Sequence, residues 1–328
     1  MKSDALRIGS RGSELALWQA RWVQNELKAR FPDLLVSIEI IKTTGDKILD
    51  SPLSKIGDKG LFTKEIEQAL LDGVVDIAVH SLKDLPTQLP AGLNIGAVCE
   101  REDVRDVFIP HPSNPEKSLL KQRQGAKIVT GSLRRKCQLL NLRPDFEVID
   151  IRGNLNTRLK KLEESDWAGM ILAKAGVVRL GWEQKIGETM GTNQILPAVG
   201  QGALGVEVRA DDRKTNEFIS VLNHTATAQA TEAERALLRT LEGGCQVPIG
   251  TFGRVELNEN GAFELELDAL VGSLDGRNVV RGTIHGNPED GEALGRQLAE
   301  TLLAGGADKI LHVIRGRVPE ATAQSIGV

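Results

Sequence analysis

The chain has no tyrosine, and only 3% of its 328 residues are aromatic. Such a scarcity leaves little surface on which unpaired bases could stack, which argues against single-stranded nucleic acid as a partner. The 41 Lys and Arg nearly balance 45 Asp and Glu, so the net charge is −4 and no general attraction to nucleic acid or an anionic membrane is expected. No apolar run approaches the roughly 20 residues that span a bilayer. We therefore expect neither a nucleic-acid nor a membrane partner.

Cysteine is also scarce, with residues at positions 99, 137 and 245. Their spacing does not match a metal site, and at least one must be unpaired. The first four residues lead into a short strand-like run rather than the apolar core of a signal peptide. The sequence therefore predicts a reduced, cytoplasmic enzyme without a metal.

Short apolar segments alternate with helical patterns from the N-terminus to residue 241, which predicts α/β architecture with parallel sheets and helices on both faces. The predicted strands are 5–10, 36–41, 75–79, 95–98, 107–109, 127–130, 148–151, 170–172 and 204–208. The predicted helices are 13–30, 61–71, 133–142, 155–163, 174–180, 213–222 and 225–241. In the first helix, Leu15, Trp18, Trp22 and Leu27 mark the expected apolar face.

The pattern changes after Gly243-Gly244. Strands at 250–257, 263–271 and 278–285, followed by a helix at 289–303, predict a small α+β domain. Domain boundaries are expected near 100–105, 197–203 and 222–226. The fold class is thus two α/β domains plus a small α+β third domain.

Four predicted strand-to-helix turns each combine a Ser or Asn cap with a cation. They are Ser10-Arg11-Gly12-Ser13, His80-Ser81-Leu82-Lys83, Gly131-Ser132-Leu133-Arg134-Arg135, and Arg152-Gly153-Asn154 with Arg158 one turn on. Free N–H groups and the positive end of the helix dipole favour anions at such turns, which gather at the carboxyl ends of strands in open α/β sheets. A single such turn is usually only a capped helix. Four together predict a ligand with several carboxylates or phosphates, for which Arg is suited.

Three further features stand out. Lys55 and Lys59 lie in the glycine-rich segment 55–60, which is either a solvated surface loop or a lid over an anionic ligand. Asp84 follows Lys83 and is either a partly buried acid/base or the carboxylate of a salt bridge. Cys245 follows two glycines that end a helix, so its thiol lies on an irregular loop and fits permanent alkylation better than turnover. Cys99 and Cys137 are expected to be buried packing residues.

The segment Gly200-Gln201-Gly202-Ala203-Leu204-Gly205 matches the dinucleotide-binding pattern G-x-G-x-x-G. A dinucleotide site needs this pattern between a strand and a helix. Here a strand follows it, so the match is rejected.

Taken in order, eight stretches resemble the hydroxymethylbilane synthase (porphobilinogen deaminase) family. They are Leu-Arg-Ile-Gly-Ser-Arg at 6–11, Thr-Thr-Gly-Asp-Lys-Ile-Leu-Asp at 43–50, Lys-Gly-Leu-Phe-Thr-Lys-Glu at 59–65, Val-His-Ser-Leu-Lys-Asp-Leu-Pro at 79–86, Ser-Leu-Arg-Arg at 132–135, Arg-Gly-Asn at 152–154, Leu-Pro-Ala-Val-Gly-Gln-Gly-Ala at 196–203, and Leu-Glu-Gly-Gly-Cys-Gln-Val-Pro-Ile-Gly at 241–250. They span nearly the whole chain.

This resemblance implies a cytoplasmic, monomeric transferase of tetrapyrrole biosynthesis. It would join four porphobilinogen molecules head to tail with loss of ammonia, on a dipyrromethane cofactor, and release hydroxymethylbilane by hydrolysis. The implied fold is two domains like those of periplasmic binding proteins, 1–99 with 200–222 and 100–199, and a cofactor-carrying domain at 223–328. The segment 100–106 would be a hinge between the first two.

The resemblance also implies roles for single residues. Cys245 matches the cysteine that holds the cofactor through a thioether, and Asp84 matches the catalytic aspartate. The matches to carboxylate-binding positions are Arg11, Ser13, Lys83, Ser132, Arg134, Arg135, Arg152 and Arg158. Lys55 and Lys59 fall in a flexible loop of the family, and Phe62 is expected near the substrate ring. Gly131 stands where the family often has Ser, which removes a possible hydroxyl donor.

Other classes of function remain distinguishable. A non-catalytic polyanion-binding protein would share the fold and the arginines but would not need Cys245. A DNA-binding regulator would need a helix-turn-helix, which the third domain does not offer. A transferase with a catalytic cysteine would regenerate its thiol in each cycle, whereas the resemblance predicts permanent modification.

Overall fold

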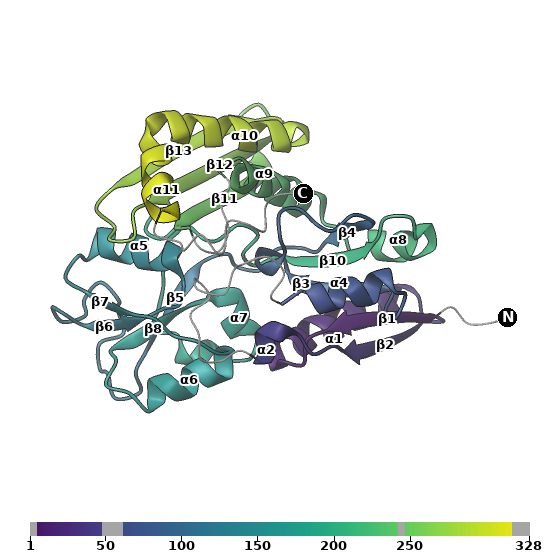
Figure 1. The fold of residues 1–328 in the computed structure, drawn as a ribbon, viewed down its shortest axis with the longest axis horizontal. Coiled ribbons are helices and arrows are strands. Elements are labelled where there is room, and N and C mark those ends of the chain that lie inside the picture. The colour runs from purple at the N-terminus through teal and green to yellow at the C-terminus, as the bar shows by residue number, and fades with distance from the viewer. Residues whose placement is uncertain (1–4, 48–61, 242–246, 317–328) are drawn as a thin grey trace.

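The computed structural model describes residues 5–47, 62–241 and 247–316. Within these ranges the strands form three sheets, of five, five and three strands, and each sheet carries its own helices (Figure 1). Lys55, Lys59 and Cys245 lie outside the described residues.

The first sheet has the strand order β2-β1-β3-β10-β4. Its strands are β1 Ala5–Ser10, β2 Leu35–Ile40, β3 Ile77–Ser81, β4 Leu93–Val98 and β10 Leu204–Arg209. Helices α1 Glu14–Arg30 and α8 Arg213–Ser220 cover one face, and α4 Lys64–Leu71 covers the other. A short helix α2, Thr44–Lys47, follows β2.

Helix α1 begins where Ser13 accepts a hydrogen bond from Ala16 N, so the serine acts as the predicted N-cap. The face that packs on the sheet consists of Ala20, Val23 and Leu27. Of the predicted apolar face, Leu27 and Trp22 pack on the sheet, whereas Leu15 and Trp18 are partly buried beside helix α7 of the second sheet. Helix α1 packs against two layers, and its apolar residues divide between them.

The second sheet has the order β7-β6-β8-β5-β9. Its strands are β5 Asp106–Pro110, β6 Lys127–Val129, β7 Glu147–Ile149, β8 Gly169–Ala173 and β9 Glu188–Thr189. Helix α5 Leu133–Leu142 packs on one face, while α6 Leu155–Glu163 and α7 Lys174–Arg179 pack on the other; a 3-10 helix, Glu183–Lys185, precedes β9.

The third sheet is an antiparallel meander of β11 Ile249–Leu257, β12 Phe263–Gly272 and β13 Val279–Gly286. Helices α9 Thr225–Thr240, α10 Gly291–Leu302 and α11 Asp308–Arg315 cover one face, after a 3-10 helix at Pro288–Asp290. The other face meets α5, where Leu270 packs against Cys137 and Leu196. Gly295 lets α10 lie against α9, since a Cβ there would fall 2.2 Å from the Ala233 carbonyl oxygen.

Two chain segments cross between the first and second sheets, and glycines permit their close approach. Gly202 has φ +93°, and a Cβ there would lie 2.4 Å from the Glu102 carbonyl oxygen. Gly200 has φ +68°, and a Cβ there would lie 2.9 Å from Leu82 Cγ. The two glycines belong to the rejected dinucleotide pattern, and here they allow the chain to pass closely between the sheets before β10 begins.

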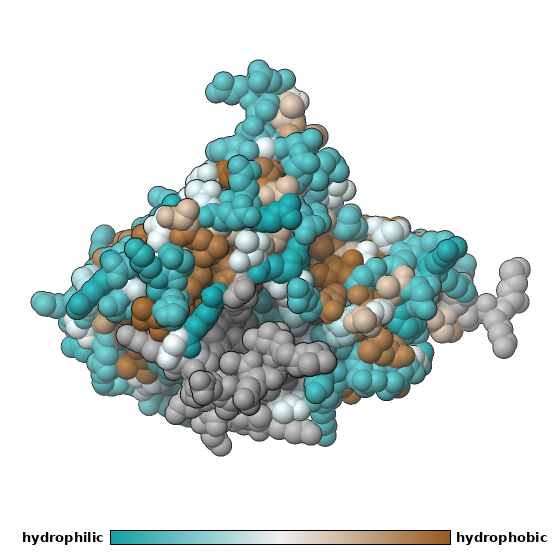
Figure 2. All heavy atoms as spheres, turned by 45° about the horizontal axis from the view of Figure 1, so that its top comes forward, coloured by the Kyte–Doolittle hydropathy of each residue, from teal (hydrophilic) through white to brown (hydrophobic). Residues whose placement is uncertain are grey.

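The predicted fold class, two α/β units followed by a small α+β unit, is confirmed with two corrections. Both α/β sheets are mixed rather than parallel, because β10 is antiparallel to β3 and β4, and β5 is antiparallel to β8 and β9. The chain also continues beyond the predicted last helix: a π-helical turn at Leu303–Ala307, with Gly306 at φ +105°, leads into α11. Among the described residues, no helix is long and apolar enough to cross a membrane. The face in Figure 2 shows hydrophobic side chains only in separate small groups.

Candidate active site

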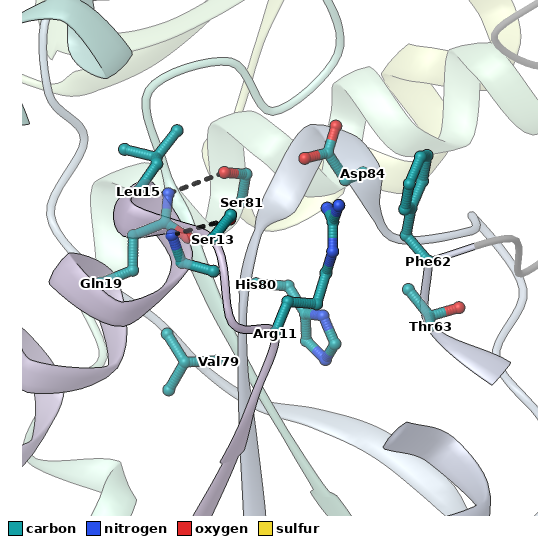
Figure 3. A pocket seen from close by; sticks show the side chains of 11 residues that line it. Arg11, Ser13, Leu15, Gln19, Phe62, Thr63, Val79, His80, Ser81 and Asp84 are labelled. Atoms are coloured by element: carbon teal, nitrogen blue, oxygen red, sulfur yellow. Dashed lines mark hydrogen bonds between the residues drawn. The ribbon is translucent and has the colours of Figure 1, made fainter. Parts of the chain in front are cut away.

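The ends of β1 and β3 and the start of α4 enclose a small cavity of about 60 Å³ (Figure 3). Its lining residues come from three segments that are distant in sequence. They are Arg11, Ser13, Leu15, Ala16, Gln19, Phe62, Thr63, Val79, His80, Ser81 and Asp84. Three of the predicted site residues, Arg11, Ser13 and Asp84, are thus brought together with Phe62.

Arg11 lies over the ring of Phe62, with its Cζ 4.2 Å from the ring centroid. Figure 3 shows the guanidinium extending toward the side of the cavity where Asp84 lies. A cation against an aromatic face gains about 0.5–2 kcal/mol, depending on exposure. The contact therefore holds the Arg11 side chain at the cavity and fixes where its charge is presented.

The predicted helix start at Ser81 is wrong. Only a three-residue 3-10 helix, Leu82–Asp84, follows β3, and Ser81 makes no capping hydrogen bond. Leu85 is extended because Pro86 follows it, and this stops the helix. Asp84 is consequently exposed at the rim of the cavity rather than partly buried. Ser81 instead accepts a hydrogen bond of 2.8 Å from Gln19 Nε2 of α1.

Lys83 extends from this turn toward the second sheet. It is partly buried and has no hydrogen-bond or ion-pair partner among the described residues. Its pKa is lowered to about 8, chiefly by burial; the charges of Arg135 and Arg134 also lower it, whereas those of Asp84 and Asp106 raise it. Lys83 is therefore an ammonium held at the junction of two sheets without a fixed internal partner.

Arg134 and Arg135 are buried at the start of α5, which Ser132 caps as predicted. Both bind Asp106: Arg134 Nη1 donates to Oδ2 at 2.7 Å and Arg135 Nη2 donates to Oδ1 at 2.8 Å. The two guanidinium groups keep the pKa of this fully buried carboxyl well below its usual range, despite the opposing effect of burial. Two charges thus face one carboxylate, which leaves this part of the site positive.

Arg152 and Arg158 flank the N-terminus of α6, where Asn154 caps the helix by accepting from Thr157 N. Arg158 Nε donates to the Gly153 carbonyl at 2.8 Å. The Arg158 pKa is lowered to about 10, chiefly by burial and also by the charges of Arg135 and Arg152, whereas Asp84 raises it. This mutual influence places Arg135, Arg152 and Arg158 in one electrostatic cluster with Asp84.

Close packing explains why position 131 is a glycine. A Cβ there would lie 2.5 Å from the Ile151 carbonyl oxygen. A serine at this position would need the backbone before Arg152 to shift. Gly131 therefore lacks the serine hydroxyl but allows the end of β6 to lie close to the loop that carries Arg152.

Helix α9, which precedes the segment that carries Cys245, contacts the turn that carries Asp84. Helix α9 ends at Thr240, and from it Arg235 donates to the Pro86 carbonyl at 2.6 Å. Leu241 and Val247, the last and first described residues around the cysteine, are buried in the core of the third sheet. Cys99 and Cys137 are unpaired and buried, as predicted.

Sequence reasoning missed several contributors. Gln19 and His80 line the cavity, and Asp106 with Gln201 forms the acceptor group around the two arginines: Gln201 Nε2 donates to Asp106 Oδ1 at 2.8 Å. Asp106 could have been suspected, since it opens a fully buried strand and an ionised carboxylate there needs partners. Gln201 carries no comparable signal. Among the described residues, no group of three His, Cys, Asp or Glu could hold a metal ion.

Cations from both α/β sheets surround the exposed carboxylate of Asp84. The first sheet contributes Lys83, and the second contributes Arg134, Arg135, Arg152 and Arg158. The fold and this site define a mixed α/β protein whose clustered cations suit a ligand bearing several negative charges.

Comparison with known proteins names the family. The porphobilinogen deaminase dipyrromethane cofactor binding domain matches residues 6–217, and the porphobilinogen deaminase C-terminal domain matches residues 228–304. Curated porphobilinogen deaminases include those of Chlorobium phaeobacteroides, 54% identical over 94% of this chain and 98% of the relative, and Chlorobaculum parvum, 54% identical over 96% and 99%. That of Carboxydothermus hydrogenoformans is 53% identical over 96% and 98%. The chain belongs to the porphobilinogen deaminase family, as the sequence motifs indicated.

Solved structures similar to this chain include the periplasmic aliphatic sulphonate binding protein of Escherichia coli, with TM-score 0.38 and 15% identity over 73% of this chain and 71% of that one. An arginine-transport periplasmic binding protein of Legionella pneumophila has TM-score 0.39 and 14% identity over 67% and 92%. The family assignment rests on the sequence matches.

Proposed function

We propose that this chain joins four porphobilinogen molecules head to tail, with loss of one ammonia at each addition, and releases hydroxymethylbilane for tetrapyrrole biosynthesis. The observation that carries the proposal is the gathering of Lys83, Arg135, Arg152 and Arg158 around Asp84. Each pyrrole ring brings an acetate and a propionate, so a growing chain of rings needs several cations near one reacting centre.

The dipyrromethane cofactor, which consists of two such rings, has the charge that this cluster requires. The Arg158 pKa is lowered partly by its own cationic neighbours, so these groups repel one another until anions are bound. Arg11, Lys83, Arg134, Arg135, Arg152 and Arg158 would hold the cofactor and substrate carboxylates, with Ser13 and Ser132 adding hydroxyl contacts. Cys245 would carry the cofactor through a thioether. When bound, the cofactor supplies the ring to which the first porphobilinogen is added.

Asp84 would act on the substrate. Its exposed carboxylate at the cavity rim can accept hydrogen bonds from pyrrole N–H groups. The same negative charge would stabilise the cationic azafulvene that porphobilinogen becomes when its C–N bond breaks and ammonia leaves with the electron pair. Phe62, already in contact with Arg11, would pack against the substrate ring, and Lys55 and Lys59 would bring further positive charge over the ligand.

Arg134 is fixed in place by hydrogen bonds to the protein. Besides Asp106, its Nη1 donates to the Leu196 carbonyl at 2.7 Å. We therefore propose that Arg134 contributes its charge to the site from a fixed position, whereas Lys83, without a fixed partner, can reorient onto a carboxylate as the chain of rings grows.

We further propose domain boundaries at residues 1–99 with 200–222, 100–199 and 223–328, with hinge motion at 100–106. The protein would act as a cytoplasmic monomer without nucleic-acid or membrane partners. The net charge of −4 supports the absence of nucleic acid, and the two unpaired buried cysteines suit a reducing compartment. A monomer suffices because both sides of the cationic cluster come from one chain.

The test is the intact mass of the purified protein, followed by peptide mapping of Cys245. A gain equal to two porphobilinogens less two ammonias, located on Cys245, supports the proposal. The matched control is Cys245→Ser, which should show no gain. An unmodified Cys245 that stays unmodified after incubation with porphobilinogen, together with no hydroxymethylbilane formed, contradicts the proposal and favours non-catalytic polyanion binding.

A further inference from the structure

A buried acid–base pair lies directly under the cavity. His80 Nε2 of β3 lies 3.1 Å from Glu207 Oε2 of β10, and the two residues are 6% and 0% exposed. The strand register, with His80 opposite Gly205 and Ala78 opposite Glu207, puts both side chains on the face that α4 covers. Nothing in the function proposed above uses this pair.

The contact with Glu207 involves one ring nitrogen of His80, Nε2, and leaves Nδ1 for another role. With Glu207 ionised, its carboxylate only accepts hydrogen bonds, so Nε2 donates to it and Nδ1 of the neutral ring is an acceptor. The ring lines the cavity together with Arg11, Ser81 and Asp84, and Nδ1 has no hydrogen-bond partner among the described residues. His80 therefore presents an unused basic nitrogen in a ring that borders the cavity.

A second buried carboxyl, that of Glu67, interacts with both members of the pair. Glu67 of α4 is 6% exposed; burial raises its pKa, and the charge of Glu207 raises it further. Glu67 Oε1 and Glu207 Oε1 are buried without a hydrogen-bond partner in the described part of the chain. The other charged groups around the pair are Arg11 and Asp84 at the cavity and Arg235 of α9, which interacts with Glu207. The carboxylate of Glu207 lies against Nε2 of His80 and so holds the ring in place.

Pyrrole condensation needs such a proton acceptor. When the ring carbon of one pyrrole forms a bond to the methylene carbon of the next, that ring carbon must lose its hydrogen as a proton. If Asp84 remains ionised to hold pyrrole N–H groups and balance the cation, a second group must take the proton.

We propose that His80, positioned by Glu207, is this proton acceptor. The inference rests on the condensation function proposed above and applies to additions in which the attacking pyrrole is itself derived from substrate. The new carbon–carbon bond forms from the ring electrons of the attacking pyrrole, its ring carbon releases a proton to Nδ1 of His80, and the ring regains its aromatic electrons. The imidazolium then passes the proton to the released ammonia, which leaves as ammonium. Neither an oxidant nor another reactant is needed.

The kinetic test uses porphobilinogen carrying deuterium at its free ring α-carbon and follows the second addition to cofactor-loaded enzyme, in which the attacking ring is derived from substrate and carries the deuterium. His80→Asn should slow addition by at least about 100-fold, the usual contribution of a general base. The ratio of rates for the light and deuterated substrates should rise above the wild-type ratio, because proton removal becomes limiting. A variant that merely displaces Asp84 would slow C–N cleavage and leave the ratio unchanged, which would overturn the proposal. A wild-type rate of addition in His80→Asn would also overturn the proposal.

Glu207→Gln provides a second variant should His80→Asn fail to fold. It keeps an oxygen for the hydrogen bond but removes the charge that stabilises the imidazolium, so the rate should fall and the isotope ratio should rise in the same direction. An unchanged rate and ratio would again reject the proposal. The matched control is His285→Asn in β13, a histidine whose side chain is 52% exposed, which should behave as wild type.

A third measurement does not depend on activity. The ring nitrogens of ¹⁵N-labelled histidine should show neutral His80 with its hydrogen on Nε2 and none on Nδ1, assigned by comparison with the two variants. A neutral ring with its hydrogen on Nδ1 would reject the proposal even in active enzyme. If wild-type protein joins no porphobilinogen, the proposed function fails instead, and the nitrogen spectrum still reports on the pair.

Discussion

Arg101 and Glu234 form a buried ion pair in which Nη1 lies 2.6 Å from Oε1 and Nη2 lies 3.1 Å from Oε2. Glu234 also accepts from Gly200 N at 2.6 Å and Gly253 N at 2.8 Å. One carboxylate of α9 thereby joins both segments that cross between the first two sheets to β11 of the third. The arrangement fixes the third sheet to the place where the other two would hinge.

Glu234→Gln should therefore lower the free energy of unfolding by about 3–5 kcal/mol, because it leaves Arg101 buried without a counter-charge. Urea unfolding monitored by circular dichroism measures the change. Glu164→Gln is the control: it removes the exposed partner of Lys160, at 3.7 Å, and should alter stability by less than about 1 kcal/mol. Equal effects of the two substitutions would contradict this account of the ion pair.

Asp106→Asn should make stability less sensitive to acid. The pKa of Asp106 is depressed in the folded protein, so its carboxylate contributes stability that is fully present above the unfolded value near 3.9. That contribution is lost as the pH falls from there through the folded pKa. Melting temperatures measured from pH 7 to pH 2 should decline less steeply in Asp106→Asn, from a lower starting value. Parallel curves would show that Asp106 does not supply this dependence.

Lys83→Met should stabilise the chain at neutral pH while impairing ligand binding. The folded-state pKa of about 8 lies below the unfolded value near 10.4, so holding the ammonium costs free energy below pH 8, and the cost fades as the pH rises toward 10.4. We expect a gain of about 0.5–2 kcal/mol at pH 7 that shrinks by pH 10.

The Lys83 measurement belongs in a Cys245→Ser background, so that no covalently held carboxylates can pair with the lysine. Lys160→Met, whose side chain is 73% exposed, is the matched control and should show no pH-dependent gain. A destabilised Lys83→Met protein at pH 7 would mean that the ammonium has a favourable partner.

Asp84→Ala should reduce turnover of porphobilinogen by at least about 100-fold, because the developing cation loses its counter-charge. The exposed position of Asp84 means that the melting temperature should change little. Intact mass should still show the modification at Cys245, which separates catalysis from cofactor attachment. A near-wild-type rate would remove Asp84 from the mechanism.

Arg152→Leu offers a complementary measurement on the carboxylate-binding side. It should slow chain assembly more than it lowers the melting temperature, since Arg152 lies at a helix N-terminus and not in a sheet core. Mass spectra of reaction mixtures should show shorter intermediates accumulating. A strongly lowered melting temperature together with an unchanged rate of assembly would show that Arg152 supports the fold and not carboxylate binding.

The amino-acid sequence by itself determined the local elements and the family. Ser13, Ser132 and Asn154 cap helices where predicted, because a cap needs only the side chain and the N–H groups within the next three residues. The motifs around Asp84 and Cys245 identified the family because they contain the residues expected to take part in the reaction.

Only the tertiary structure decided which distant residues meet. The antiparallel entry of β10 into the first sheet sets Glu207 beside His80, 127 positions earlier, and Asp106 meets Arg134 and Arg135 from another strand end. Such pairings depend on strand order and register, which are chosen by packing over the whole sheet rather than by neighbours in the chain. The helix expected after Ser81 was likewise wrong, because Pro86 keeps Leu85 extended and ends the 3-10 helix after one turn.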